Sequence, residues 1–300
     1  MVKIECVVEA ENYLGEGPVW DPMDGVLYWV DMLDKEVWRL DPRTGKTRTW
    51  TMPKTVGAFA LREQGGGVLT MRDGFYFMDL DSGETELIAL VDADEPRSLF
   101  NDGKVDRRGR FFAGGEDEIS ESPICGLFRL DPDLTVHELE RGIICNNGPS
   151  WSPDNETFYH TDSYMQEIYA YDYDIETGAI SNKRVFANTH DEPGIPDGST
   201  VDAEGYLWNA QIVSGQLVRY APDGTVDRRV PVPTKTITSI MFGGDNLDVA
   251  YLTSMGRTDF LGPEAQKIFG EASKPQPHGG GILAVSGLGV QGLAEHRFAG

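Results

Sequence analysis

The sequence predicts an all-β protein, a six-bladed β-propeller with four-stranded antiparallel blades. A short strand-forming theme returns six times, and its copies lie 41 to 49 residues apart, the period of a propeller blade. The composition agrees, because 35 glycines and 17 prolines suit many short strands joined by tight turns. A radial repeat of this kind uses its whole length, so residues 1–300 are expected to form one domain. The theme is anchored at Leu27, Val68, Phe111, Phe158, Leu207 and Val249.

Each repeat carries the signals of its own strands and turns. Residues 36–40 and 167–171 alternate apolar and polar side chains, as half-buried strands do. The hairpin between the third and fourth strands is marked by Asp, Pro and Gly, for example at 41–45 and 221–224, because these residues favour turn dihedrals. The blades are expected at about 14–52, 55–92, 98–140, 145–188, 195–233 and 236–286.

Both ends of the chain are expected to close the ring. Residues 4–8 and 293–298 resemble strands, and a propeller closes when terminal strands join one blade. Residues 256–281 interrupt the last blade with a Pro- and Gly-rich run that contains a helix-forming stretch. We expect an excursion over one face, either a lid or a passive surface loop.

Charge and cysteine content narrow the classes of partner. The net charge of −23 argues against nucleic acid and against an anionic membrane surface, since both require a basic face. Three widely spaced cysteines do not form a disulfide framework, which favours a reducing compartment. No signal peptide and no apolar run of ~20 residues is present. We therefore expect a cytoplasmic protein, a monomer or weak homo-oligomer, without nucleic-acid or membrane partners.

The functional prediction comes from the register of the repeat. Ten or eleven residues before each anchor lies an equivalent position, and in four of the six repeats it carries a carboxylate or an amide. Asn/Asp-Gly pairs on their own usually mark turns, but equivalent residues of a radial repeat surround its axis, so these four should meet at the mouth of the central channel. The six positions are Glu16, Gly57, Asn101, Asn147, Asp197 and Ser239.

Such a set favours a hard divalent cation. Two carboxylates and one or two amide oxygens suit Ca²⁺, Mg²⁺, Mn²⁺ or Fe²⁺. Zn²⁺ is less suited, because the five histidines are scattered and form no HExxH pair. A divalent ion can polarise a carbonyl or lower the pKa of bound water towards ~7. The set therefore predicts metal-assisted hydrolysis of an ester or lactone, since no G-x-S-x-G nucleophile motif is present.

With these motifs in view, the chain resembles the SMP-30/gluconolactonase/regucalcin-like family over nearly its whole length. The resemblance is carried by LGEGPVW, FNDGKVDRRGRFFAG, NNGPSW and IPDGSTVDAEGYLW. It implies a six-bladed propeller with one divalent metal ion, held by Glu16, Asn147 and Asp197. It also implies that Asp197 is the catalytic general base and that Asn101 and Glu118 bind the substrate.

One departure from the family pattern concerns the substrate. The family often has an arginine two residues before the asparagine of NDG, and here that position is Leu99. This leaves the reaction class intact and the sugar preference open. We expect a gluconolactonase-like enzyme that hydrolyses an aldonolactone to its aldonic acid. The alternatives are a promiscuous metal-dependent esterase or organophosphate hydrolase, and a non-catalytic calcium- or ligand-binding propeller.

Overall fold

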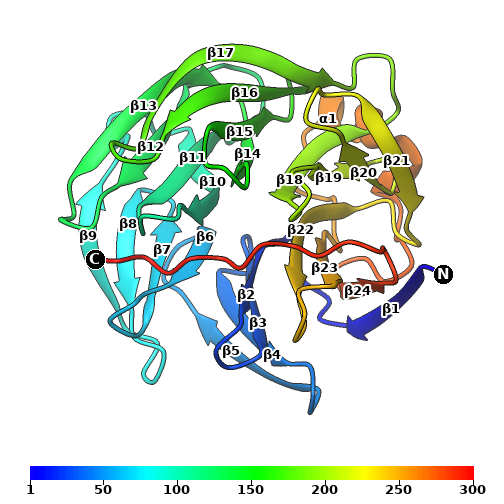
Figure 1. Cartoon of the computed structure of the whole chain (residues 1–300), viewed down its shortest axis with the longest axis horizontal. Helices are drawn as coiled ribbons and strands as arrows, with labels where there is room; N and C mark the ends of the chain where they lie inside the picture. The colour runs from blue at the N-terminus through cyan, green and yellow to red at the C-terminus, as the bar shows by residue number, and fades with distance from the viewer.

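Six four-stranded antiparallel sheets surround a central channel in the computed structural model (Figure 1). The model describes the backbone of residues 1–300 and every side chain except those of residues 263 and 264. The predicted six-bladed propeller is confirmed. Blade 1 is β2 (Gly15–Asp21), β3 (Val26–Asp31), β4 (Glu36–Asp41) and β5 (Lys46–Thr51). Blade 2 is β6 (Val56–Leu61), β7 (Gly67–Met71), β8 (Gly74–Met78) and β9 (Thr85–Leu90).

The next three blades repeat this up-and-down order. Blade 3 is β10 (Ser98–Val105), β11 (Phe111–Asp117), β12 (Cys125–Leu130) and β13 (Val136–Ile143). Blade 4 is β14 (Asn146–Trp151), β15 (Thr157–Asp162), β16 (Glu167–Asp174) and β17 (Ala179–Asn188). Blade 5 is β18 (Ile195–Val201), β19 (Leu207–Ile212), β20 (Gln216–Tyr220) and β21 (Val226–Pro231).

Blade 6 joins the two parts of the chain that are farthest apart in sequence. It runs in the order β22 (Ile237–Gly243), β23 (Val249–Ser254), β24 (Ile282–Ser286) and β1 (Lys3–Val8). The N-terminal strand thus closes the ring as predicted. In each blade the first strand lines the channel and is almost wholly buried, whereas the fourth is largely exposed. Apolar side chains between neighbouring blades form the core, as where Tyr28 stacks on Phe59 with ring centroids 5.3 Å apart.

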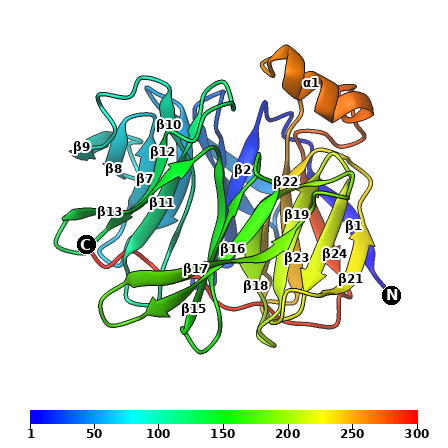
Figure 2. The same cartoon turned by 90° about the horizontal axis from the view of Figure 1, so that it is seen from above.

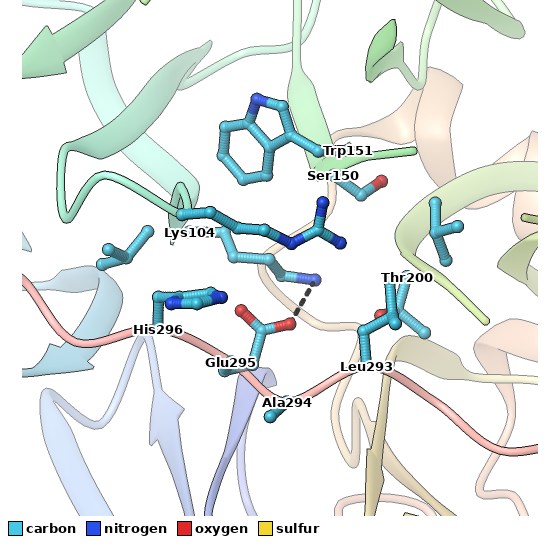
Figure 3. Close-up of a pocket in the computed structure, with 11 residues that line it drawn as sticks. Lys104, Ser150, Trp151, Thr200, Leu293, Ala294, Glu295 and His296 are labelled. Atoms are coloured by element: carbon cyan, nitrogen blue, oxygen red, sulfur yellow. Dashed lines mark ion pairs between the residues drawn. The ribbon is translucent and has the colours of Figure 1, made fainter. Parts of the chain in front are cut away.

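The predicted C-terminal strand at 293–298 is wrong. This segment forms isolated bridges, Arg62 with Phe298 and Asp202 with Gly292, and no ladder. Its alternating pattern has another cause, because the segment crosses the mouth where the innermost strands end (Figure 1). The residues at 293, 295 and 297 are partly buried, and those at 294 and 296 are exposed. Phe298 is fully buried there, and Lys104 and Glu295 form an ion pair at 3.7 Å in the lining of a cavity of about 30 Å³ (Figure 3).

Residues 256–281 form the predicted excursion over one face. It contains α1 (Pro263–Phe269) and the short 3₁₀ helix Gly270–Ser273. Phe269 packs in one cluster with Ile195 and Met255, beside the mouth where the innermost strands begin. Figure 2 shows α1 on the face opposite the C-terminal segment. No helix among the described residues is long and apolar enough to cross a membrane.

The innermost strands share one irregularity. Each pairs with its neighbour through a register shift at or next to the repeated position. In β2, Glu16 pairs with Val30, but the next paired residue is Val19, opposite Tyr28. A bulge of this kind bends the strand and redirects its side chains. The repeat thus builds six bulges around one ring, and the predicted site residues sit in them.

Candidate metal centre at the channel mouth

The structure brings four of the predicted residues together at one mouth of the channel. Glu16, Asn101, Asn147 and Asp197 lie in the innermost strands of blades 1, 3, 4 and 5, and each is at most 7% exposed. At the other two repeat positions, Gly57 and Ser239, neighbouring innermost strands approach each other closely. At Gly57, a Cβ would lie 2.5 Å from the carbonyl oxygen of Phe100, so a side chain there would collide with the neighbouring strand.

The amide side chains have one defined orientation. The Nδ2 of Asn101 donates to the carbonyl oxygen of Asn146 at 2.8 Å, which identifies that atom as the nitrogen. The same Nδ2 donates to the Oδ1 of Asn147 at 3.1 Å, and the Nδ2 of Asn147 donates to the Oγ of Ser163 at 2.9 Å. These bonds occupy the amide nitrogens, so the oxygens are the atoms left to meet a cation.

The two carboxylates are held close together without a basic partner. Burial raises the pKa of Glu16 well above its usual value, and the charges of Asp197 and Asp102 raise it further. Burial likewise raises the pKa of Asp197, followed by the charge of Asp102. Among the described side chains, the hydrogen bonds of Glu16 and Asp197 come from the backbone N–H groups of the following glycines, at 3.1 and 3.0 Å.

These observations fit a divalent cation. Buried carboxylates are costly unless they are paired or bind a metal, and two positive charges would match the charges of Glu16 and Asp197. The oriented oxygen of Asn147 supplies a neutral hard ligand beside them. The donor set therefore suits the ion that the sequence predicted, and its oxygen-only composition favours hard cations over Zn²⁺.

Glu118 does not lie with this group. It stands at the rim of the mouth, where its carboxylate takes two hydrogen bonds from the guanidinium of Arg72, at 3.0 and 2.9 Å, and its side chain is 52% exposed. Its substrate-binding role, which came from the family resemblance, stays a prediction. The acid nearer to this group is Glu116, whose Oε2 accepts a hydrogen bond from the Cys145 thiol at 3.5 Å.

Two further groups lie at the mouth, Asp102 and Cys145. Asp102 is buried and accepts hydrogen bonds from the backbone N–H groups of Gly103 and Gly148, both at 2.7 Å. The thiol of Cys145 lies 3.6 Å from the Nδ2 atoms of Asn101 and of Asn147, and burial raises its pKa. In the sequence, each stands close to a predicted site residue: Asp102 follows Asn101, and Cys145 precedes Asn147 by two residues. Cys145 is a protonated structural thiol rather than a nucleophile.

Comparison with known proteins agrees with this fold. Residues 14–256 match the family model described as SMP-30/gluconolactonase/LRE-like region. The chain is 37% identical to regucalcin of Xenopus laevis, over 100% of this chain and 99% of the relative. The structure of a luciferin-regenerating enzyme superposes with a TM-score of 0.91 at 28% identity, covering 100% of both chains.

A bacterial structure extends the likeness. The calcium-binding protein regucalcin of Agrobacterium tumefaciens superposes with a TM-score of 0.88 at 27% identity, over 98% of this chain and 96% of that one. The family match covers all the innermost strands and the four side chains that meet at the mouth. The chain therefore belongs to the SMP-30/gluconolactonase/LRE-like family.

Proposed function

We propose that this protein is a lactonase, a carboxylic ester hydrolase that opens a sugar lactone to the aldonic acid. The observation that carries the proposal is the pair of buried, unpartnered carboxylates, Glu16 and Asp197, at an open channel mouth. A purely structural mouth gives no reason to bury two acids without a cation. Membership of a family whose description names gluconolactonase supports this choice of reaction.

The metal would be held by Glu16, Asn147 and Asp197. When bound, a divalent ion supplies Lewis-acid chemistry: it polarises a carbonyl and acidifies water. Ca²⁺ is favoured by the oxygen-only donors and by the description of the Agrobacterium relative as calcium-binding, while Mg²⁺, Mn²⁺, Fe²⁺ and Zn²⁺ are the ions to test against it.

Asp197 would act as the general base. One of its oxygens accepts the N–H of Gly198 at 3.0 Å, which fixes the carboxylate and leaves the second oxygen to take a proton from water. The water oxygen then bonds to the lactone carbonyl carbon, the ring C–O bond breaks, and the former ring oxygen receives the proton. The oxygen of Asn101 would accept a hydrogen bond from a sugar hydroxyl, since its nitrogen is already bonded.

The wider setting is proposed on the same grounds. The cysteines at positions 6, 125 and 145 are free thiols, and the chain is strongly acidic, which supports a cytoplasmic protein without nucleic-acid or membrane partners. We propose a monomer or weak homo-oligomer whose partner is the small-molecule lactone. The excursion at 256–281 borders a cavity of about 230 Å³ that Thr236 and Met255 also line.

The experiment is lactone hydrolysis by metal-stripped protein, followed with a pH indicator. Ca²⁺, Mg²⁺, Mn²⁺, Fe²⁺ and Zn²⁺ are added back separately, against several pentono- and hexonolactones and against simple esters and an organophosphate. Turnover of sugar lactones restored by one ion supports the proposal. Preference for the esters or the organophosphate would favour the promiscuous hydrolase. Tight metal binding without any turnover would favour the non-catalytic binding protein.

A further inference from the structure

Glu116 is an acid of the channel mouth that has no cationic partner. It lies in β11, and an isolated bridge joins it to Cys145 at the edge of blade 4. Its Oε2 accepts a hydrogen bond from the Cys145 thiol at 3.5 Å. The same thiol lies 3.6 Å from the Nδ2 atoms of Asn101 and Asn147, so the Glu116 carboxylate is one side chain away from the candidate metal site. It is partly exposed there, and so is accessible to whatever enters the mouth.

The next two residues, Asp117 and Glu118, are also acidic, but each of them is paired with an arginine. Asp117 is fully buried and lies 3.4 Å from the guanidinium of Arg97. Glu118 forms the two-bonded pair with Arg72. Of three consecutive acids, Asp117 and Glu118 are each paired with an arginine. Glu116 receives only a thiol.

The cross-strand partner of Glu116 explains why it stays unneutralised. The residue paired with it on β10 is Leu99, which is 5% exposed and apolar. A long basic side chain at that position could reach the carboxylate of a directly paired residue. Here the position supplies no charge. The two positive charges of a divalent ion would balance the negative charges of Glu16 and Asp197. The negative charge of Glu116 would then remain without a balancing charge.

We propose that Glu116 is a specificity-determining residue that contacts the substrate, accepting hydrogen bonds from hydroxyl or ammonium substituents and disfavouring carboxylates. The inference rests on the proposed function and names its substrate class: sugar lactones whose substituents are neutral or cationic donors, amino-substituted lactones above all. An ammonium group would gain a charge-assisted hydrogen bond to Glu116, and a carboxylate would meet like charge in a partly desolvated space. Near neutral pH, burial raises the pKa of Glu116 to about 7, and a nearby divalent cation favours its ionised form.

The test uses binding rather than turnover. Three lactams with the same ring, bearing a hydroxyl, an ammonium or a carboxylate substituent, are titrated calorimetrically into Ca²⁺-loaded protein at pH 8. We expect wild type to bind them in the order ammonium, hydroxyl, carboxylate. Glu116→Gln should lower the affinity for the ammonium lactam about tenfold and raise that for the carboxylate lactam several-fold. Glu204→Gln is the matched control and should leave the order and ratios unchanged, because Glu204 follows the end of β18, at the other mouth, and lies 2.6 Å from Arg219.

The outcomes separate this inference from the proposed function. If Glu116→Gln keeps the wild-type affinity ratios while its thermal unfolding shows an intact fold, Glu116 does not read the substrate. If no lactam binds wild type, the inference is also overturned. If the ratios shift as expected but the corresponding lactones are not hydrolysed by wild type, the inference about Glu116 holds and the lactonase proposal fails.

Discussion

Buried acids at one mouth of the channel form ion pairs with arginines, whereas four acids at the other mouth form none with the described side chains. Where the innermost strands end, Asp106 lies 2.6 Å from Arg110, Asp202 lies 2.7 Å from Arg219, and Asp21 accepts two bonds from Arg297 at 2.9 Å. The C-terminal segment covers that mouth. Where the same strands begin, the carboxylates of Glu16, Asp102, Glu116 and Asp197 form no ion pair with any described side chain.

This contrast shows which end of the ring has a function beyond folding. At the covered mouth, buried acids are neutralised by arginines of their own blade or of the C-terminal segment. Buried acids without partners lower the stability of the fold, and proteins keep such acids at sites that bind ligands or catalyse reactions. Substitutions of single acids at either mouth test this difference.

The largest expected effect is on activity. Asp197→Asn removes both the proposed base and one ligand charge, so the kcat for lactone hydrolysis should fall by about 10²–10⁴-fold. The change is close to isosteric, so circular dichroism should show an intact propeller. The measurement is kcat at saturating substrate and metal. A variant that turned over at the wild-type rate would remove Asp197 from the mechanism.

At the covered mouth the largest effect should be on folding instead. Asp106→Asn removes the carboxylate that pairs with Arg110, whose side chain is 7% exposed and otherwise bonds to carbonyl groups and the Tyr173 hydroxyl. An uncompensated buried charge should lower the free energy of unfolding by about 3–5 kcal/mol. Urea unfolding measures this, and metal affinity at the other mouth should not change. An unchanged stability would mean that the pairing is not what distinguishes the mouths.

An Asp→Asn substitution at the open mouth should instead increase the stability of the metal-free protein. In metal-free protein, Asp197→Asn should raise the free energy of unfolding at pH 8 by about 1–3 kcal/mol, because it relieves repulsion between buried acids. The pH dependence follows from Glu116, whose pKa rises from 4.5 to about 7 on folding. Its contribution to stability is present below 4.5 and is lost as the pH rises through 7.

Urea unfolding of metal-free wild type across pH 4 to 8 should therefore show stability falling between about 4.5 and 7. Glu116→Gln should flatten that part of the curve. A metal-free protein that became more stable over this range, with Asp197→Asn less stable than wild type, would mean that the open mouth is not under electrostatic strain.

The smallest effect is expected at the rim. Glu118→Gln breaks the pair with Arg72, but both side chains are substantially exposed, and such pairs contribute about 0–1 kcal/mol. We expect the free energy of unfolding to change by less than about 1 kcal/mol and kcat/KM to change by less than about twofold. A loss of kcat/KM beyond tenfold would instead confirm Glu118 as the substrate-binding residue that the family resemblance implied.

The repeat made the fold and four of the site residues predictable. Glu16, Asn101, Asn147 and Asp197 could be identified because a propeller turns equal sequence register into equal distance from one axis. Glu116 could not, because three acids follow one another at 116–118 and the sequence alone does not tell which faces the channel. The pairing of Glu116 with Leu99, one residue before the bulge that shifts the register of β10, decides it.

The C-terminal segment illustrates a second limit. Alternating side chains at 293–298 predicted a strand, but the blade it would have joined already had four strands once β1 was added. The alternation instead reflects a segment that crosses the ring, with Phe298 buried against blades 2 and 3. The local sequence pattern indicates which side chains are buried, whereas the strand with which a segment pairs depends on how the whole ring closes.

The central claim is that the unpaired acids of the open mouth bind a divalent cation. Calorimetric titration of metal-free protein with Ca²⁺, at pH 7 in two buffers of different ionisation enthalpy, tests it most directly. We predict one ion per chain and release of protons on binding, because the raised pKa values of Glu16 and Asp197 leave protons to be displaced. Glu16→Gln should abolish both signals, and Asp106→Asn should keep them. Binding that survives in Glu16→Gln, or no binding by wild type of Ca²⁺ or of the other four ions, would contradict the account.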